Sequence, residues 1–190
     1  MRSSSFPSSS WVVAAMVLLA ALSRLLPHPP NFSPIEAIAL FAGTHMSSRL
    51  VAAATPLLAL LLSDLLMAAL LGPLYAGYMG SVSFWCVYGT VALLSVLGWA
   101  LRSRLSPSSI LGYATLSAVI FFLTTNLGAW LGSPFYPATP QGLLMAYLAG
   151  LPFFPWTWLG AVLWSAALFG GYHTLSRKWE VLRPEASARG

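Results

Sequence analysis

The chain has 190 residues, of which 58% are hydrophobic and only 7% are charged. A soluble globular domain carries about 25% charged residues, so these side chains are too few to cover a water-facing surface. The formal net charge of +5 comes from scattered basic residues, and no basic patch interleaved with exposed aromatics indicates nucleic-acid binding. The composition is typical of an all-α integral membrane protein in a lipid bilayer, and the length suits one membrane domain.

Six apolar runs divide the chain, and each predicts a membrane-spanning helix. In chain order they cover residues 11–26, 35–46, 50–71, 83–101, 110–131 and 153–175. Polar or Pro- and Gly-rich segments separate them at residues 27–34, 47–49, 72–80, 102–109 and 133–142, and residues 143–150 are predicted to form an interfacial piece. A span needs about 20 residues at 1.5 Å each, so the second run is a short or tilted member.

The basic residues predict the orientation of these spans, because cytoplasmic segments of membrane proteins are enriched in Lys and Arg. With six spans, eight of the nine basic residues fall on one side: Arg2, Arg49, Arg102, Arg104, Arg177, Lys178, Arg183 and Arg189. The three opposite loops contain neither Lys nor Arg, and five spans would spoil this segregation. We therefore expect both termini in the cytoplasm. Residues 1–10 are a disordered cytoplasmic tail, 11–175 a single six-helix domain, and 176–190 a second cytoplasmic tail.

Ionisable residues inside the apolar runs need an explanation, because a charge in a bilayer costs several kcal/mol unless it is paired or faces a cavity. Arg24, Glu36 and Asp64 all fall in the outer halves of their spans. One interpretation is a buried ion-pair network that fixes helix packing. The other is a polar cavity open to the periplasm, and the two are compatible.

The remaining chemistry-bearing side chains lie at the same depth. Cys86, the only cysteine, and Tyr88 begin the fourth span, and His28 lies among prolines in the first outer loop. A free Cys often behaves as a small buried hydrophobe, and a solvated loop His is unremarkable. No HExxH, CxxC or GxxxxGK[ST] pattern occurs, so nothing indicates a zinc site or a nucleotide-hydrolysing loop.

The segment from Arg24 to Gly43, with the sequence RLLPHPPNFSPIEAIALFAG, is the most specific part of the chain. It is similar to a signature of small bacterial membrane proteins related to the substrate-binding (S) components of energy-coupling-factor (ECF) vitamin transporters. Within that group, the whole chain resembles the BtuM-type cobalamin transporters of Gram-negative bacteria.

This resemblance implies an S-component-like fold in the bacterial inner membrane and the uptake of cobalamin. It implies that Cys86 is an axial ligand of the corrin cobalt, with His28, Asp64 and Tyr88 in the pocket and Tyr88 beside the thiol. A thiolate suits cobalt, and we expect it to promote loss of an upper cyano ligand. The fit to the group is incomplete. Small residues four apart, which mark docking on a shared ECF ATPase module, are absent from the first span. This favours a protein that works alone, without a nucleotide.

Three other functions remain open from the sequence. The chain could be an S component for another small ligand, energised by a partner. It could be an intramembrane enzyme with Asp64 or Glu36 as acid or base and Cys86 as nucleophile, for which only His28 lies at a suitable depth. It could also be a purely structural membrane subunit.

Overall fold

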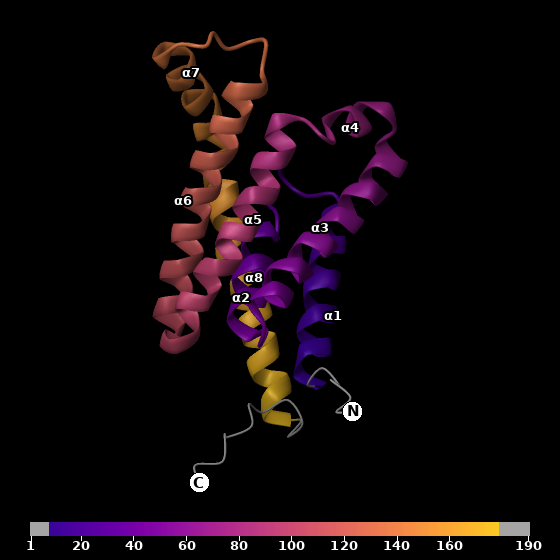
Figure 1. Ribbon diagram of the computed structural model, residues 1–190. Coiled ribbons are helices and arrows are strands. Elements are labelled where there is room, and N and C mark those ends of the chain that lie inside the picture. Colours follow the sequence, from indigo (N-terminus) through magenta and orange to yellow (C-terminus); the bar gives the residue numbers. More distant parts are fainter. Residues whose placement is uncertain (1–7, 179–190) are drawn as a thin grey trace.

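The computed structural model describes residues 8–178, and every regular element in that range is a helix (Figure 1). The α-helices are α1 (Ser8–Leu22), α2 (Ile35–His45), α3 (Arg49–Leu71), α4 (Pro73–Tyr78), α5 (Val82–Leu101), α6 (Pro107–Gly132), α7 (Pro140–Gly150) and α8 (Phe154–Lys178). Short 3-10 turns are η1 (Ser23–Leu25), η2 (Arg102–Arg104) and η3 (Leu151–Phe153). The all-helical expectation is confirmed for this part of the chain.

Four stretches are long and apolar enough to cross a membrane: Arg49–Leu71, Val82–Arg104, Pro107–Gly132 and Pro140–Lys178. Two shorter apolar helices, Ser10–Leu25 and Ile35–His45, accompany them. The chain is therefore a multi-pass membrane protein by length and composition. The described chain begins and ends at one end of the bundle, here called the terminal end, and α4 and α7 lie at the opposite, distal end (Figure 1).

Helix α2 forms the centre of the bundle although it is only 11 residues long. Its residues Ile35 to Thr44 are all buried, and α1, α3, α5, α6 and α8 pack around it. A helix surrounded in this way needs no polar face, which explains why its sequence is apolar on every side. At 1.5 Å per residue it is about 16 Å long, roughly half a bilayer core.

Glycine allows α2 and α5 to approach backbone to backbone. A Cβ on Gly43 would lie 3.0 Å from the Cα of Gly98, and a Cβ on Gly98 would meet the carbonyl oxygen of Leu40. The Thr44 hydroxyl lies 3.0 Å from the Gly98 carbonyl oxygen. The hydrophobic effect between helices is weak in lipid. Close packing of small residues stabilises such a crossing instead.

The guanidinium of Arg102 binds the end of α2. Its Nε donates to the carbonyl oxygen of Thr44 at 3.0 Å, and Nη2 donates to Gly43 at 3.1 Å and also to Met46. The last carbonyls of a helix have no partner within it. Arg102 supplies that partner and fastens the end of α2 to the end of α5.

Several element boundaries differ from the expectation. Helix α1 begins at Ser8, so residues 8–10 are helical rather than a disordered tail, while residues 1–7 lie outside the described part. The expected loop at 72–80 contains α4, which starts at Pro73, because proline suits the first helical position. Helix α8 continues to Lys178, and the rest of the C-terminal tail lies outside the described residues.

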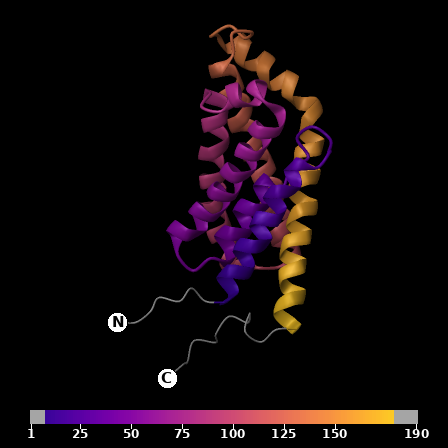
Figure 2. The ribbon, with the colours of Figure 1, turned by 90° about the vertical axis from the view of Figure 1, so that its right-hand side faces the viewer.

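Prolines bend the last span instead of dividing it. Helix α7 begins at Pro140, where the Thr139 side chain accepts a hydrogen bond from the Gly142 N–H at 3.2 Å. Residues 140–142 are therefore helical and not loop. Pro152 falls in η3, and Figure 2 shows α7 and α8 as one bent helix along the side of the bundle. Proline at a helix start, where no N–H is needed, accounts for this continuity.

Candidate functional site

Asp64 is the centre of a polar network in the distal half of α3. Its side chain is almost fully buried, with a relative exposure of 3%. Arg24 of η1 donates to Oδ1 at 2.6 Å, Tyr75 of α4 donates to Oδ1 at 2.9 Å, and Tyr88 of α5 donates to Oδ2 at 2.8 Å. One carboxylate thereby joins four elements.

The Arg24 side chain is nearly as buried as its partner, at 13% exposure. Besides the ion pair, Nη1 donates to the Ser63 hydroxyl at 2.5 Å and Nη2 to the Tyr75 hydroxyl at 3.4 Å. Buried charges are stable only when they are paired and hydrogen-bonded, and both conditions are met. The structure therefore supports the ion-pair interpretation for Arg24 and Asp64.

Aromatic side chains of α4 and α5 cover this network on the distal side. The ring of Tyr78 lies 5.8 Å from those of Tyr75 and Phe84, and Phe84 lies 4.4 Å from Tyr88. Burial, reinforced by Tyr75 and Asp64, raises the pKa of Tyr78 to about 12. Burial also raises the pKa of Tyr75 above its usual value. Both phenols therefore stay neutral at neutral pH, and Tyr75 acts as a donor to Asp64.

Cys86 lies on the opposite side of α5 from this network. A Cβ on Gly128 of α6 would lie 2.7 Å from both Cβ and Sγ of Cys86, so the half-buried thiol packs on α6 where a side chain is missing. One turn on, the Thr90 hydroxyl donates to the Cys86 carbonyl at 2.7 Å and lies 2.7 Å from the Thr124 hydroxyl of α6.

The expectation that Tyr88 lies beside the thiol is corrected by this geometry. Cys86 and Tyr88 are two residues apart on one helix, and such residues do not face each other. Tyr88 therefore reaches α3, and Cys86 faces α6. The structure brings Asp64 and Tyr88 together and places Cys86 on a different helix face at the same end of the bundle.

His28 is exposed in the loop between η1 and α2, and its Nδ1 lies 2.9 Å from the carbonyl oxygen of Pro29. The hydrogen bonds of the described residues do not connect it to Asp64, Tyr88 or Cys86. Of the four residues expected in one pocket, Asp64 and Tyr88 are hydrogen-bonded to each other, whereas His28 and Cys86 have no hydrogen bond to that pair in the described part of the chain.

Glu36 does not join the ion-pair network either. It lies in the first turn of α2 with an exposure of 1%, and neither carboxyl oxygen has a hydrogen-bond partner among residues 8–178. An unpaired buried carboxylate costs far more than a buried neutral acid. We therefore treat the Glu36 side chain as an uncharged carboxylic acid that helps to fill the centre of the bundle.

Comparison with known proteins gives one assignment. Residues 4–183 match the family described as "Family of unknown function (DUF6580)". The chain belongs to the DUF6580 family. No curated protein and no solved structure matches it.

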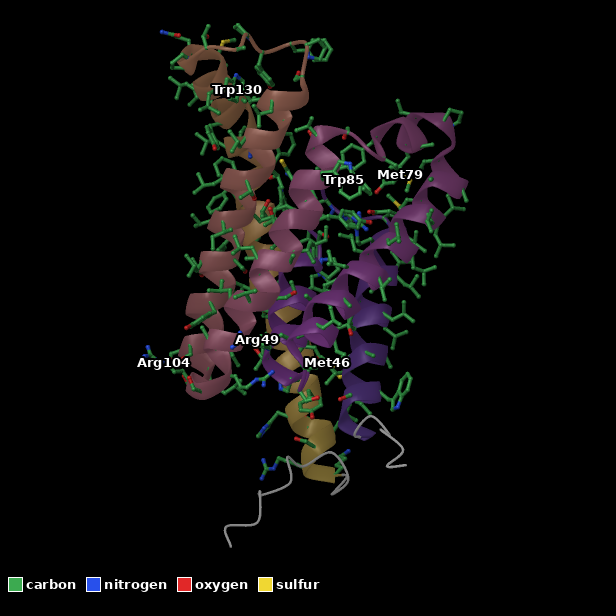
Figure 3. All side chains as sticks on the ribbon, in the orientation of Figure 1. Met46, Arg49, Met79, Trp85, Arg104 and Trp130 are labelled. Atoms are coloured by element: carbon green, nitrogen blue, oxygen red, sulfur yellow. The ribbon has the colours of Figure 1, made fainter. Side chains whose placement is uncertain are left out.

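In this DUF6580 chain, three hollows lie in the terminal half of the bundle, away from Asp64 and Cys86. A hollow of about 350 Å³ lies between α6 and α8, a second of about 220 Å³ between α3 and α5, and a third of about 130 Å³ between α1 and α3. Figure 3 shows the two ends, with Arg49 and Arg104 at the terminal end and Trp85 and Trp130 at the distal end.

Sequence reasoning missed Ser63 and Gly128, which shape the distal end of this DUF6580 chain, and gave Tyr75 no role in the ion pair. Ser63 and Tyr75 complete the Arg24–Asp64 pair, and Gly128 receives the Cys86 side chain. The adjacency of Ser63 to Asp64 gives a signal, since both lie on the same buried stretch of α3. Gly128 gives none, because its partner lies more than forty residues away on another helix.

Proposed function

We propose that this DUF6580 protein is a six-span transport protein of the bacterial inner membrane that captures cobalamin from the periplasmic side. The spans would be α1, α2, α3, α5, α6 and α8, whose directions alternate along the chain in Figure 1. Among the described residues, Arg49, Arg102, Arg104, Arg177 and Lys178 belong to elements that begin or end at the terminal end. Enrichment of basic residues there supports a cytoplasmic terminal end and a periplasmic distal end.

One observation carries the cobalamin proposal. The lone thiol of the described chain, Cys86, lies half-buried in the first turns of α5 and packs on Gly128 rather than on a large side chain. A soft thiolate is a suitable ligand for cobalt. Since Sγ packs against the α6 backbone at Gly128, α6 would have to move away from α5 for the thiol to face a bound ring.

The separated residues then take different roles. Cys86 would ligate the cobalt from the α6 side of α5. Asp64 and Tyr88 would act from the other side, where their hydrogen bond fixes the rotation of α5. His28, exposed in the outer loop, would contact the substrate at the entrance. The thiol and the Asp64 network are therefore two parts of one distal binding region, divided by α5.

Atoms and electrons balance when Cys86 ligates the cobalt of cyanocobalamin. The Cys86 thiol loses its proton and forms an S–Co(III) bond, while the nucleotide base leaves that face. On the opposite face the Co–C bond breaks with both electrons on cyanide, which takes up the proton as HCN. Cobalt stays Co(III), so no reductant is required. The step is stoichiometric in Cys86.

The experiment is the absorption spectrum of the full chain purified after expression with cyanocobalamin. We expect a pink to orange protein, a thiolate-ligated corrin spectrum, and loss of that spectrum in Cys86→Ser. Gly112→Ala serves as a matched control, since a Cβ there has no neighbour within 4 Å. A colourless protein would overturn the proposal and favour an S component for another ligand, and an unchanged corrin spectrum in Cys86→Ser would refute ligation of the cobalt by the thiol.

Uptake without an ECF ATPase module has a separate test. A cobalamin-dependent host that lacks its own importer should grow on limiting vitamin when only this chain is supplied. Growth that needs an ECF module in addition would show an energised S component. The intramembrane-enzyme alternative has less support, because His28 bonds with its own loop and Asp64 lies across α5 from Cys86.

A further inference from the structure

A second site lies at the terminal end of the bundle, where α3 begins and α5 ends. The hollow of about 220 Å³ between these helices is lined by Arg49, Ala52, Ala53, Ser95, Val96 and Trp99. Its lining is mostly apolar, with one cationic and two polar side chains. It is independent of the distal residues discussed above.

Arg49 brings a charge that no described carboxylate balances. Its guanidinium carbon lies 4.2 Å from the centroid of the Trp99 ring, and the side chain is otherwise exposed. Within residues 8–178 the carboxylates are Asp64, which pairs with Arg24, and Glu36, which is buried at the start of α2. Arg102 also approaches Trp99, but its donors bind the end of α2. Arg49 is thus available to an external anion.

Trp99 supplies an independent indication. Its indole Nε1 is buried and has no hydrogen-bond acceptor within the described residues. An unsatisfied buried donor is costly, and native structures rarely leave one without a partner. The first N–H groups of α3 lie beside Arg49 and have no intrahelical partner, and the Ser48 side chain does not cap them. These three kinds of donor lie at or beside the hollow, and none has an acceptor among the described residues.

The surroundings identify the kind of acceptor. Leu50 is 78% exposed and Val96 is 62% exposed, so the hollow opens to the apolar outer surface of the bundle. Trp99 and Arg49 lie at the end of membrane-spanning stretches, where aromatic and basic residues meet lipid headgroups. Helix N-termini and arginines are suited to phosphate oxygens.

We propose that this hollow binds an anionic phospholipid, with its phosphate at Arg49 and the indole N–H of Trp99 and an acyl chain along Ala52, Ala53 and Val96. A lipid explains both the polar and the apolar parts of the lining. A soluble anion would use only the polar part. The bound lipid would hold the beginning of α3 against the end of α5.

The test is native mass spectrometry of the full chain, released from detergent after titration with phosphatidylglycerol or phosphatidylcholine. We expect retention of one phosphatidylglycerol and about ten-fold weaker retention of phosphatidylcholine. Trp99→Phe, which keeps the ring but removes the N–H, and Arg49→Gln should each weaken phosphatidylglycerol binding by about ten-fold, the scale of one charge-assisted hydrogen bond. Arg104→Gln is the matched control, since Arg104 is a basic residue of the same end that does not line the hollow.

Three results would overturn the proposal. An equal loss in Arg104→Gln would show general attraction of basic residues to anionic lipid. Unchanged binding in Trp99→Phe would remove the specific site. Competition by inorganic phosphate at the same concentration as lipid would make a soluble anion the occupant. If Arg49→Gln does not fold, Arg49→Lys keeps the charge and should retain most binding, while Trp99→Phe decides the question.

Discussion

Replacing Asp64 by Ala should cost more stability than any other polar substitution at the distal end. The change removes the acceptor of three hydrogen bonds and leaves the guanidinium of Arg24, only 13% exposed, without its counter-charge. Removing one partner of a buried ion pair costs about 3–5 kcal/mol. Tyr88→Phe removes one hydrogen bond to the carboxylate, and Tyr75→Phe removes one to the carboxylate and a longer one from Arg24. A hydrogen bond to a charged group is worth about 1.5–3 kcal/mol.

The assay is reversible unfolding of the full chain by SDS in mixed micelles, followed by tryptophan fluorescence. The double variant Arg24→Met/Asp64→Ala should be less destabilised than the sum of the two single variants, because no charge is left unpaired. For residues in contact the difference is about 0.5–3 kcal/mol. A loss below about 1 kcal/mol in Asp64→Ala, as for exposed ion pairs, or strict additivity in the double variant, would refute this reasoning.

Three further predictions concern single positions. Gly98→Ala should destabilise the protein by about 1–3 kcal/mol through overpacking against α2, whereas Gly112→Ala, which faces open space, should be neutral or stabilising in the same unfolding assay. Glu36→Gln should change the unfolding free energy by less than about 1 kcal/mol, because it replaces an uncharged acid by an uncharged amide of the same shape; a larger gain in stability would show that the carboxylate is charged and unpaired, and a larger loss that a partner binds it. Because the folded-state pKa of Tyr78 is raised to about 12, the folded protein keeps a proton that the unfolded chain loses near pH 10. Stability should therefore be complete below pH 10 and fall as the pH rises toward 12, and Tyr78→Phe should reduce that slope in unfolding experiments across this range.

The sequence was sufficient to predict that Arg24 and Asp64 share one end of the bundle but not the direction in which each polar residue points. Arg24 and Asp64 lie in the same half of the bundle and do pair. Glu36 was assigned to the same half and does not join them, because the face of α2 on which it falls depends on packing by five neighbours. Depth follows from counting residues along a span, whereas direction depends on how each helix is rotated.

The expectation that Tyr88 lies beside the Cys86 thiol could have been corrected from the sequence. Cys86 and Tyr88 are separated by two residues in a continuous apolar run, and helical geometry alone places them on different faces. Their common pocket came from the resemblance and not from the spacing. In contrast, the contact between Cys86 and Gly128 depends on the register of two antiparallel helices, which no local pattern determines.

Boundaries were predicted to within one residue for α3 and α5. They were wrong where proline begins a helix. Pro73, Pro107 and Pro140 each occupy the first turn of a helix within segments expected to be loops. Because proline disrupts a helix interior but suits its first turn, its meaning depends on the residues that follow it.

The hydrogen bonds from Arg102 to the end of α2 restrict how α2 can move relative to α5. Separating α2 from α5 would leave the last carbonyl groups of α2 without the donors that Arg102 supplies. With the glycine crossing above it, this makes α2 and α5 one rigid spine. We therefore expect any opening of the bundle to leave α2 and α5 together and to move the helices packed around them.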